Sequence, residues 1–340
     1  MPKPAILVLA PPDSLTTRLL HLLTSSSPFS GHPILITSLT TSPSPSLTSN
    51  PNLHPIPFSW PDSGTWSKPF EFPLSPPPSQ GGDNNNNNKT ASSSGRGGSK
   101  TEIGAVYIAP PPAGGEGTAN PAELVEDFVG FAKKRGVKRF VVLRADGPVR
   151  GMGSVERWLR ELGRDEKEVE WAVLRAGWVQ QNFVDQPVQL QGIRDDSKIY
   201  SAAGQGRVAW VSADDVAAIA VRALTDREPP NTVYTILGPE LLTYNQIAAI
   251  LTETLGRQIV HTIVSPAELQ RRHECNVPRT HAATLVAMDT SVKVGVREQT
   301  NDVVLALTGH APKPFREFAR SAKELWEKPG DGRLAAVWEV

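Results

Sequence analysis

The 340-residue chain contains a single cysteine, Cys275, so no disulfide can form within it, and we expect a cytoplasmic protein. Its charges cancel, because lysine plus arginine and aspartate plus glutamate each number 35. This balance predicts no binding to nucleic acid or to an anionic membrane. No apolar run is long enough to span a membrane, and the run at residues 5–10 is too short for a signal peptide, so it predicts a strand.

Several enzyme motifs are also missing. None of the four tyrosines has a lysine four residues later, so the Tyr-x-x-x-Lys pair of many dehydrogenases is absent. There is no G-x-S-x-G hydrolase elbow, and the seven histidines show no metal-binding spacing with acids, so we predict no metal site. Two glycine patterns do not indicate a dinucleotide site. In the one at residues 151–153, Glu156 replaces the third glycine, and the one at residues 204–209 lies between two predicted strands, where a hairpin turn is expected.

Strands alternate with helices along the first part of the chain, which predicts an α/β protein with a Rossmann-like, doubly wound parallel sheet. The predicted strands are residues 6–9, 33–37, 103–109, 138–144 and 171–174, with a short strand near 56–58. The predicted helices are residues 14–23, begun by Asp13 or Ser14, then 121–135 and 154–162.

The pattern changes after residue 185, and we expect a smaller mixed C-terminal lobe there. The expected elements are a hairpin of residues 198–201 and 207–211, strands at 232–237 and 258–264, helices beginning after Ser212, Thr243 and Ser265, and a helix at 314–326. We therefore predict a dinucleotide-binding domain at residues 1–185, a substrate lobe at 186–326 and a tail at 327–340. Residues 75–100, rich in Asn, Gly and Ser, predict a disordered insertion without chemistry.

The stretch at residues 170–185 is the most informative. An apolar strand ends at Arg175, and the loop that leaves it carries Trp178, Gln181, Asn182 and Phe183. Ligands of open α/β sheets bind at the carboxyl ends of strands, so this mixture of aromatic and amide side chains predicts a substrate site. Packing of Trp178 and Phe183 in the core is an equally good interpretation of the pattern alone.

The first turn lacks the G-x-G-x-x-G motif that lets backbone approach a pyrophosphate. It reads Ala-Pro-Pro-Asp-Ser at residues 10–14. Pro11 and Pro12 have no backbone N–H to offer, and Asp13 adds a negative charge. We therefore expect weak dinucleotide binding at this turn.

Longer motifs resemble one family. They are VYIAPPP at residues 106–112, FAKKRGVKRFVVL at 131–143, VLRAGWVQQNF at 173–183, ILGPELLTYNQI at 236–247 and LGRQIVH at 255–261. In these the chain resembles the festuclavine/agroclavine dehydrogenases of ergot-alkaloid biosynthesis, a fungal NmrA-like branch of atypical short-chain dehydrogenases. The departures lie on the cofactor side, where Leu39, Ala145, Ser154 and Glu156 replace family residues.

The resemblance implies NADP(H) or NAD(H) as cofactor and a small-molecule substrate. The cofactor-lining residues that we predict are Pro12, Asp13, Ser14, Ala109, Pro110, Pro111, Arg144, Ala145, Ala176 and Gly177. The implied activity is reduction of an iminium-type intermediate in alkaloid secondary metabolism, and no residue is assigned as catalytic. Two alternatives remain open: a non-catalytic NmrA-like protein that binds or senses dinucleotide, and, more weakly, a partner-binding protein that uses the Asn-rich insertion.

Overall fold

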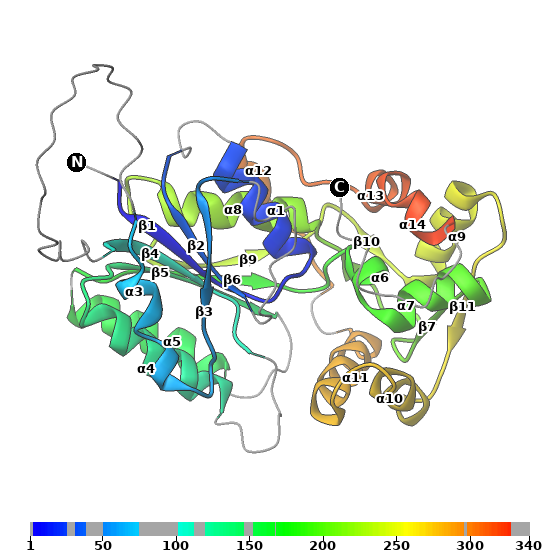
Figure 1. Ribbon diagram of the computed structural model, residues 1–340. Coiled ribbons are helices and arrows are strands. Elements are labelled where there is room, and N and C mark those ends of the chain that lie inside the picture. The colour runs from blue at the N-terminus through cyan, green and yellow to red at the C-terminus, as the bar shows by residue number, and fades with distance from the viewer. Residues whose placement is uncertain are drawn as a thin grey trace, which may run out of the picture.

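A seven-stranded parallel sheet forms the centre of the molecule (Figure 1). The computed structural model describes residues 3–25, 31–38, 50–74, 101–111, 120–145, 152–166, 168–295 and 298–327. In sheet order the strands are β3 (Leu53–Pro57), β2 (Ile34–Ser38), β1 (Ala5–Leu9), β4 (Ile103–Ile108), β5 (Arg139–Ala145), β6 (Glu170–Ala176) and β9 (Thr232–Ile236). Every neighbouring pair is parallel, which confirms the predicted Rossmann-like fold.

Helices cover both faces of this sheet, and the alternation of strand side chains explains why. Val8, Tyr107 and Val141 lie in the core under α1 (Ser14–Ser25), α8 (Ala213–Thr225) and α12 (Val303–Thr308). The neighbouring residues Leu7, Val106 and Phe140 lie in the opposite core, under α3 (Lys68–Glu71), α4 (Pro121–Lys133) and α5 (Met152–Asp165). Both faces are thus buried, as expected for a parallel sheet.

The sheet's strands run so that their carboxyl ends face a second, smaller part of the molecule (Figure 1). It contains two small sheets and eight helical segments in the described part of the chain. The strands are β7 (Lys198–Ser201), β8 (Val208–Ala209), β10 (Leu241–Leu242) and β11 (Val260–Ile263). The helices are α6 (Asn182–Asp185), α7 (Pro187–Gln191), the π-helical turn Gly192–Asp196, α9 (Tyr244–Leu255), α10 (Pro266–Glu274), α11 (Arg279–Lys293), α13 (Phe315–Ser321) and α14 (Lys323–Glu327).

Three elements beyond residue 185 belong to the large sheet and its cover. Strand β9 pairs with β6, α8 packs on α1, and α12 packs on α8 and β9. The chain therefore leaves the sheet layer after β6, returns to it for α8 and β9, leaves again for α9, and returns once more for α12. The segment 186–326 is consequently not one continuous lobe in space, although the predicted domain boundaries themselves stay a prediction.

The predicted hairpin of residues 198–201 and 207–211 is wrong. Strand β7 pairs with β11 in parallel, and β8 pairs with β10 in antiparallel, so both partners are distant in sequence. Between β7 and β8 the glycine pattern forms a turn, with Gly204 in the left-handed region at φ 60°. A Cβ on Gly206 would lie 2.1 Å from the Val292 carbonyl oxygen, so close packing against α11 requires this glycine.

Helix boundaries follow the predicted caps. Thr243 and Gln246 form a reciprocal capping box at α9, and Gly256 ends that helix at φ 66°. Ser212 and Ser265 cap α8 and α10 with their hydroxyl groups. The helix predicted at residues 314–326 is instead two short helices, α13 and α14, separated at Ala322.

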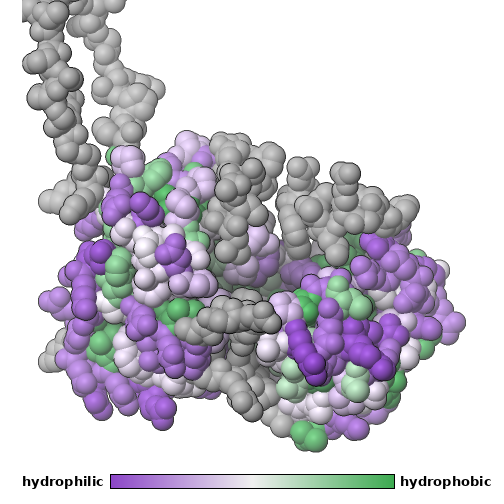
Figure 2. All heavy atoms as spheres, turned by 60° about the horizontal axis from the view of Figure 1, so that its bottom comes forward, coloured by the Kyte–Doolittle hydropathy of each residue, from purple (hydrophilic) through white to green (hydrophobic). Residues whose placement is uncertain are grey.

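On the face shown in Figure 2, both parts of the molecule expose mostly hydrophilic residues, and apolar residues form small separate groups.

Candidate active site

Small residues end four adjacent strands of the sheet. Ala10 and Ala109 directly follow β1 and β4, and Ala145 and Ala176 are the last residues of β5 and β6. Gly177 continues the series after β6 and is buried. Ala10, Ala109 and Ala176 are buried in the core, and no large side chain stands at these positions of the edge where α/β proteins bind dinucleotides. Pro110 and Pro111 lie at the same edge, after β4, and are half-buried.

The first turn fits a pyrophosphate less well. The Asp13 carboxylate accepts a hydrogen bond of 2.8 Å from the Thr16 backbone N–H, so a side chain already caps the start of α1. Pro11 and Pro12 are exposed and carry no N–H group. The Ser14 hydroxyl donates a hydrogen bond of 2.7 Å to Asp185 Oδ1, which lies at the end of α6. The helix terminus that would attract phosphate is thus already bonded to carboxylates.

Burial perturbs the acids of this turn. It raises the pKa of Asp185 to about 7, and the nearby Asp13 charge adds to the effect. Burial also raises the pKa of Asp13 and, with the charge of Asp13, places the pKa of Tyr107 well above its ordinary value. The Tyr107 hydroxyl has no hydrogen-bond partner among the described residues. At neutral pH the carboxyl groups of this turn therefore carry a negative charge or none, and Arg18 is a nearby cation.

Arg144 lies at the end of β5, but its guanidinium is engaged on the α5 side. It donates a hydrogen bond of 3.1 Å to Glu156, and Arg175 donates bonds of 2.6 Å and 2.9 Å to the same carboxylate. Although burial alone favours the neutral acid, Arg175 and Arg144 hold the pKa of Glu156 below its usual value. Glu156 therefore neutralises these two arginines, and contact of Arg144 with a cofactor stays a prediction.

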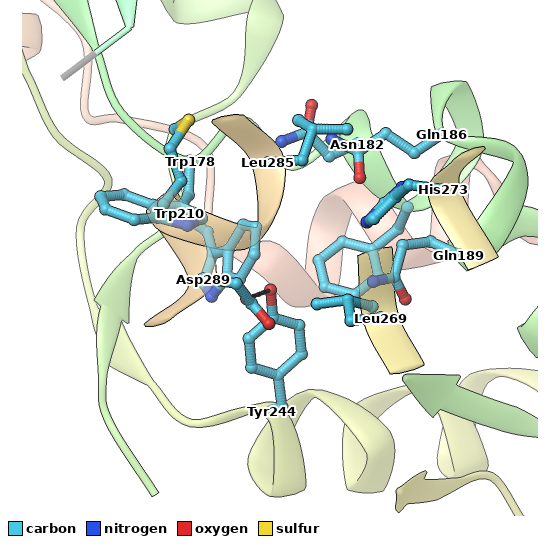
Figure 3. Close-up of a pocket in the computed structure, with 12 residues that line it drawn as sticks. Trp178, Asn182, Gln186, Gln189, Trp210, Tyr244, Leu269, His273, Leu285 and Asp289 are labelled. Atoms are coloured by element: carbon cyan, nitrogen blue, oxygen red, sulfur yellow. Dashed lines mark hydrogen bonds between the residues drawn. The ribbon is translucent and has the colours of Figure 1, made fainter. Parts of the chain in front are cut away.

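A pocket in the smaller part adjoins the loop after β6. Its residues come from that loop, from α6, α7 and α9, and from the α10–α11 pair. They are Trp178, Asn182, Phe183, Gln186, Gln189, Trp210, Tyr244, Leu269, His273, Leu285, Met288 and Asp289. Figure 3 shows these side chains arranged around Asp289 and Tyr244. The cavity volume is about 40 Å³, so it accommodates a small group such as a methylated nitrogen rather than a whole ring system.

Three of the four predicted substrate residues line this pocket, namely Trp178, Asn182 and Phe183. Gln181 does not line it. Its side chain is 1% exposed, and its Oε1 accepts a hydrogen bond of 2.7 Å from the Ala213 N–H at the start of α8. Gln181 thus ties the loop to α8, and the assignment of the other three to substrate stays a prediction.

The core interpretation of the loop also holds in part. The Phe183 ring is 1% exposed and lies 4.9 Å from the Trp210 ring and 5.2 Å from the Phe315 ring, measured between centroids. Trp178 is 8% exposed and belongs to the same apolar cluster. These aromatic side chains therefore build the wall of the pocket and the core of the lobe together.

Sequence reasoning missed the polar residues of the pocket. The Tyr244 hydroxyl donates a hydrogen bond of 2.8 Å to Asp289 Oδ1, and the Ala202 N–H donates to Oδ2. Burial raises the pKa of Asp289 to about 6 and lowers that of His273 to about 4. A signal existed for Asp289: it falls on the buried face of α11 with Ala282 and Val286, where an apolar residue is expected.

No protein-family model matches the chain. It is 34% identical to festuclavine synthase II of Penicillium roqueforti over 327 residues, which cover 94% of this chain and 99% of that relative. It is 37% identical over 233 residues to festuclavine dehydrogenase of Aspergillus fumigatus and 35% over 229 residues to agroclavine dehydrogenase of Claviceps fusiformis. Both of these matches cover 66% of the chain and 76% of the relative. The chain belongs to the festuclavine and agroclavine dehydrogenase family. Membership confirms the resemblance found in the sequence motifs and makes the protein an oxidoreductase.

Solved structures share the fold at low sequence identity. An NADPH-dependent quinone oxidoreductase of Escherichia coli, complexed with NADPH, matches with a TM-score of 0.68 and 16% identity, over 93% of this chain and 99% of that one. The triphenylmethane reductase of Citrobacter sp., complexed with NADP(H), matches with a TM-score of 0.68 and 17% identity, over 94% and 99%. These similarities show that the overall fold is shared. Among the described residues, no helix is long and apolar enough to cross a membrane, and no cluster of metal-binding side chains is found.

Proposed function

We propose that the protein is an NAD(P)H-dependent oxidoreductase that reduces a cationic iminium-type intermediate of alkaloid secondary metabolism. One observation carries this proposal: in a chain of the clavine dehydrogenase family, the loop leaving β6 supplies Trp178, Asn182 and Phe183 to a pocket beside the strand ends. The two solved structures with the same fold are complexed with NADPH and NADP(H), which supports the cofactor class.

The strand edge would hold the nicotinamide part of the cofactor, through Ala109, Pro110, Ala145, Ala176 and Gly177. The Ser14 hydroxyl and the first turn would hold the phosphates, with the lower affinity that Asp13 and Asp185 impose. A reduced nicotinamide, when bound, supplies a hydride. The chain's own contribution is to bind and orient the substrate beside this edge and to keep water away from it.

Reduction of an iminium suits a site without a Tyr-x-x-x-Lys pair. The hydride adds to the carbon of the C=N bond, and the π electron pair becomes the lone pair of the resulting neutral amine. No proton has to be delivered, whereas reduction of a ketone forms an alkoxide that needs one. The two buried tyrosines near the site fit this picture. Tyr107 is fully buried, and Tyr244 already donates its proton in a hydrogen bond to Asp289.

Positioning then falls to the pocket wall. Trp178 lines the pocket with its indole, and the indole face attracts cations more strongly than an aliphatic side chain does. Asn182 follows at the start of α6 and is half-buried, so its amide remains available for a polar group of the substrate or cofactor. These roles are part of the proposal.

The test uses 2-methyl-3,4-dihydroisoquinolinium, a permanently charged iminium, with NADPH and NADH in parallel. We expect oxidation of one dinucleotide and formation of the tetrahydro amine, detected by mass spectrometry. Titration by nicotinamide fluorescence, without substrate, measures dinucleotide affinity separately. Dinucleotide binding without turnover of this or any related iminium would contradict the proposal.

The first turn favours a second candidate, a non-catalytic protein that binds dinucleotide as a signal. Two carboxylates, Asp13 and Asp185, lie where a pyrophosphate is expected to bind. This candidate predicts dinucleotide binding with no turnover and no affinity for cationic amines, so the same two assays distinguish it from the enzyme.

A further inference from the structure

Asp289 is a buried carboxylate whose counter-ion is not part of the described chain. Its residue is 6% exposed, and it accepts hydrogen bonds from the Tyr244 hydroxyl and the Ala202 amide. No lysine, arginine or histidine of the described residues forms an ion pair with it, and no opposite charge lowers its pKa. A buried charge without a partner is unfavourable, so this arrangement needs an explanation.

Two other carboxylates, one buried and one half-buried, have cationic partners. Glu156 pairs with Arg144 and Arg175, and Asp214 pairs with Arg18 and Lys313. Asp185 and Asp215 form no ion pair among the described residues, but nearby cations act to lower their pKa values, namely Arg18 for Asp185 and His310 and Lys313 for Asp215. Asp289 has no such cation near it in the described part of the chain, and it lies inside the pocket.

The surroundings of Asp289 suit a cation rather than an anion. The pocket wall contains the aromatic rings of Trp178, Trp210 and Phe183, which offer π faces to a positive charge. A neighbouring acceptor, Gln189 Oε1, is buried without a hydrogen-bond partner among the described residues. Figure 3 shows Asp289 between the two tryptophans and Tyr244.

We propose that Asp289 is the counter-ion of the substrate's cationic nitrogen and that Tyr244 is the positioning residue that holds its carboxylate. This inference rests on the proposed function, because it assigns the charge of the substrate to this pocket. The nitrogen and its methyl-sized substituent occupy the cavity, and the rest of the molecule extends past Trp178 and Asn182 toward the strand ends.

Only the ionised form of Asp289 serves as a counter-ion, so affinity for a permanent cation depends on pH. The titratable groups on neighbouring elements are Tyr244 on α9, His273 on α10, His281 on α11 and His261 on β11. Burial lowers the pKa of each of these histidines and raises that of Tyr244. Cation affinity should therefore be constant above about pH 7 and fall roughly tenfold per pH unit below the Asp289 pKa of about 6.

The experiment is calorimetric or fluorescence binding of 2-methyl-3,4-dihydroisoquinolinium to the full chain without dinucleotide. Its neutral carbon isostere, 3-methyl-1,2-dihydronaphthalene, is titrated in parallel. For Asp289→Asn we expect about 30-fold or greater loss of cation affinity at neutral pH, with isostere affinity nearly unchanged. Glu156→Gln removes another buried carboxylate outside the pocket and serves as the matched control, with no change in the preference for the cation.

Tyr244→Phe separates positioning from bulk packing. Its hydroxyl favours the charged carboxylate, so its loss should move the midpoint of the pH profile upward while the cation still binds at high pH. If Asp289→Asn does not fold, the wild-type pH profile still decides the matter. Equal affinity of cation and isostere, a flat profile between about pH 5 and 8, or no cation binding at millimolar concentration overturns the proposal. Because the titration contains no dinucleotide, its result can be interpreted even if the protein catalyses no reduction.

Discussion

Asp185 and Asp289 are two buried carboxylates with opposite consequences. Each accepts a hydrogen bond from a hydroxyl group, Ser14 in one case and Tyr244 in the other, and burial raises both pKa values, to about 7 and about 6. Asp185 lies at the first turn, where an anionic pyrophosphate is expected, whereas Asp289 lies in a pocket lined with aromatic rings. In the proposed function, the same chemical group therefore weakens the binding of one ligand and strengthens that of the other.

This comparison gives a pH dependence for the whole reaction. Below about pH 7 Asp185 becomes neutral, which removes repulsion from the dinucleotide, and above about pH 6 Asp289 is charged and binds the cation. At subsaturating concentrations of both ligands, turnover should be fastest between these two values. The dinucleotide turn and the substrate pocket can then be tested separately by substitutions in each.

The largest effect is expected at the first turn. Replacing Pro11 and Pro12 with glycine, together with Asp13→Thr, restores two N–H groups and removes one charge. NADPH affinity should rise by roughly 100-fold, since two new bonds and one lost repulsion each contribute on the order of 1 kcal/mol. Nicotinamide fluorescence measures the gain, and cation binding serves as the control. An unchanged NADPH affinity would show that this turn does not limit dinucleotide binding.

Next in size is the effect of Trp178→Leu. Loss of the indole should reduce iminium affinity and turnover efficiency between a few-fold and about 30-fold, corresponding to roughly 0.5–2 kcal/mol of cation attraction. Affinity for the neutral isostere should change less, and NADPH affinity should stay the same. The core interpretation predicts instead a loss of stability only, with normal activity per folded molecule.

Because Trp178 is 8% exposed, we also expect this variant to melt at a lower temperature than the wild type, by an amount typical of a buried substitution. The substrate interpretation by itself predicts little change in stability, and the observed burial corrects that expectation. The cation-to-isostere ratio is therefore the informative readout, since loss of packing affects both ligands alike.

A smaller effect is expected for Asp185→Asn. The folded-state pKa of Asp185 is about 7 against an ordinary value of 3.8, so the native protein binds more protons than the unfolded chain between these values. Stability consequently falls as pH rises through this window, and the loss persists above it. The variant should melt a few degrees higher at about pH 8 and bind NADPH roughly threefold to tenfold more tightly. Both gains should largely vanish at about pH 5, and gains that are equal at the two pH values would contradict the account.

The smallest effect is expected for deletion of residues 75–100, which lie outside the described part of the chain. A low-complexity insertion contributes little to the core, so replacement by a short Gly/Ser linker should leave the fold intact. A fall in melting temperature beyond about 5 °C would contradict this prediction. Neither ligand's affinity should change.

Sequence patterns predicted the elements whose determinants are local. The capping box at Thr243, the stop at Gly256 and the apolar strand before Arg175 all depend on residues within a few positions. Pairings that depend on distant segments were not predictable in this way. Strand β7 finds its partner β11 about sixty residues later, and β9 returns to the large sheet after the chain has left it.

The site shows the same division. Aromatic and amide residues after β6 stand out in the sequence, and three of the four line the pocket. In the sequence nothing separates Gln181 from the neighbouring residues that line the pocket. Only the folded structure shows that its side chain accepts a hydrogen bond from the Ala213 amide instead. Asp289 lies more than a hundred residues from Trp178 and reaches the same pocket because α11 packs over it. The sequence shows that Asp289 falls on a buried helix face, but it does not show that the residue has no counter-ion.

Transfer of deuterium from NADPH that carries deuterium at both C4 positions of the nicotinamide tests the central claim most directly. The account predicts that the wild-type protein converts 2-methyl-3,4-dihydroisoquinolinium to the tetrahydro amine with one deuterium at the former iminium carbon. It also predicts that the ketone 2-tetralone, which needs a proton donor, is not reduced at about pH 8. Reduction of 2-tetralone as fast as the iminium, or an iminium that gains no deuterium, would contradict it.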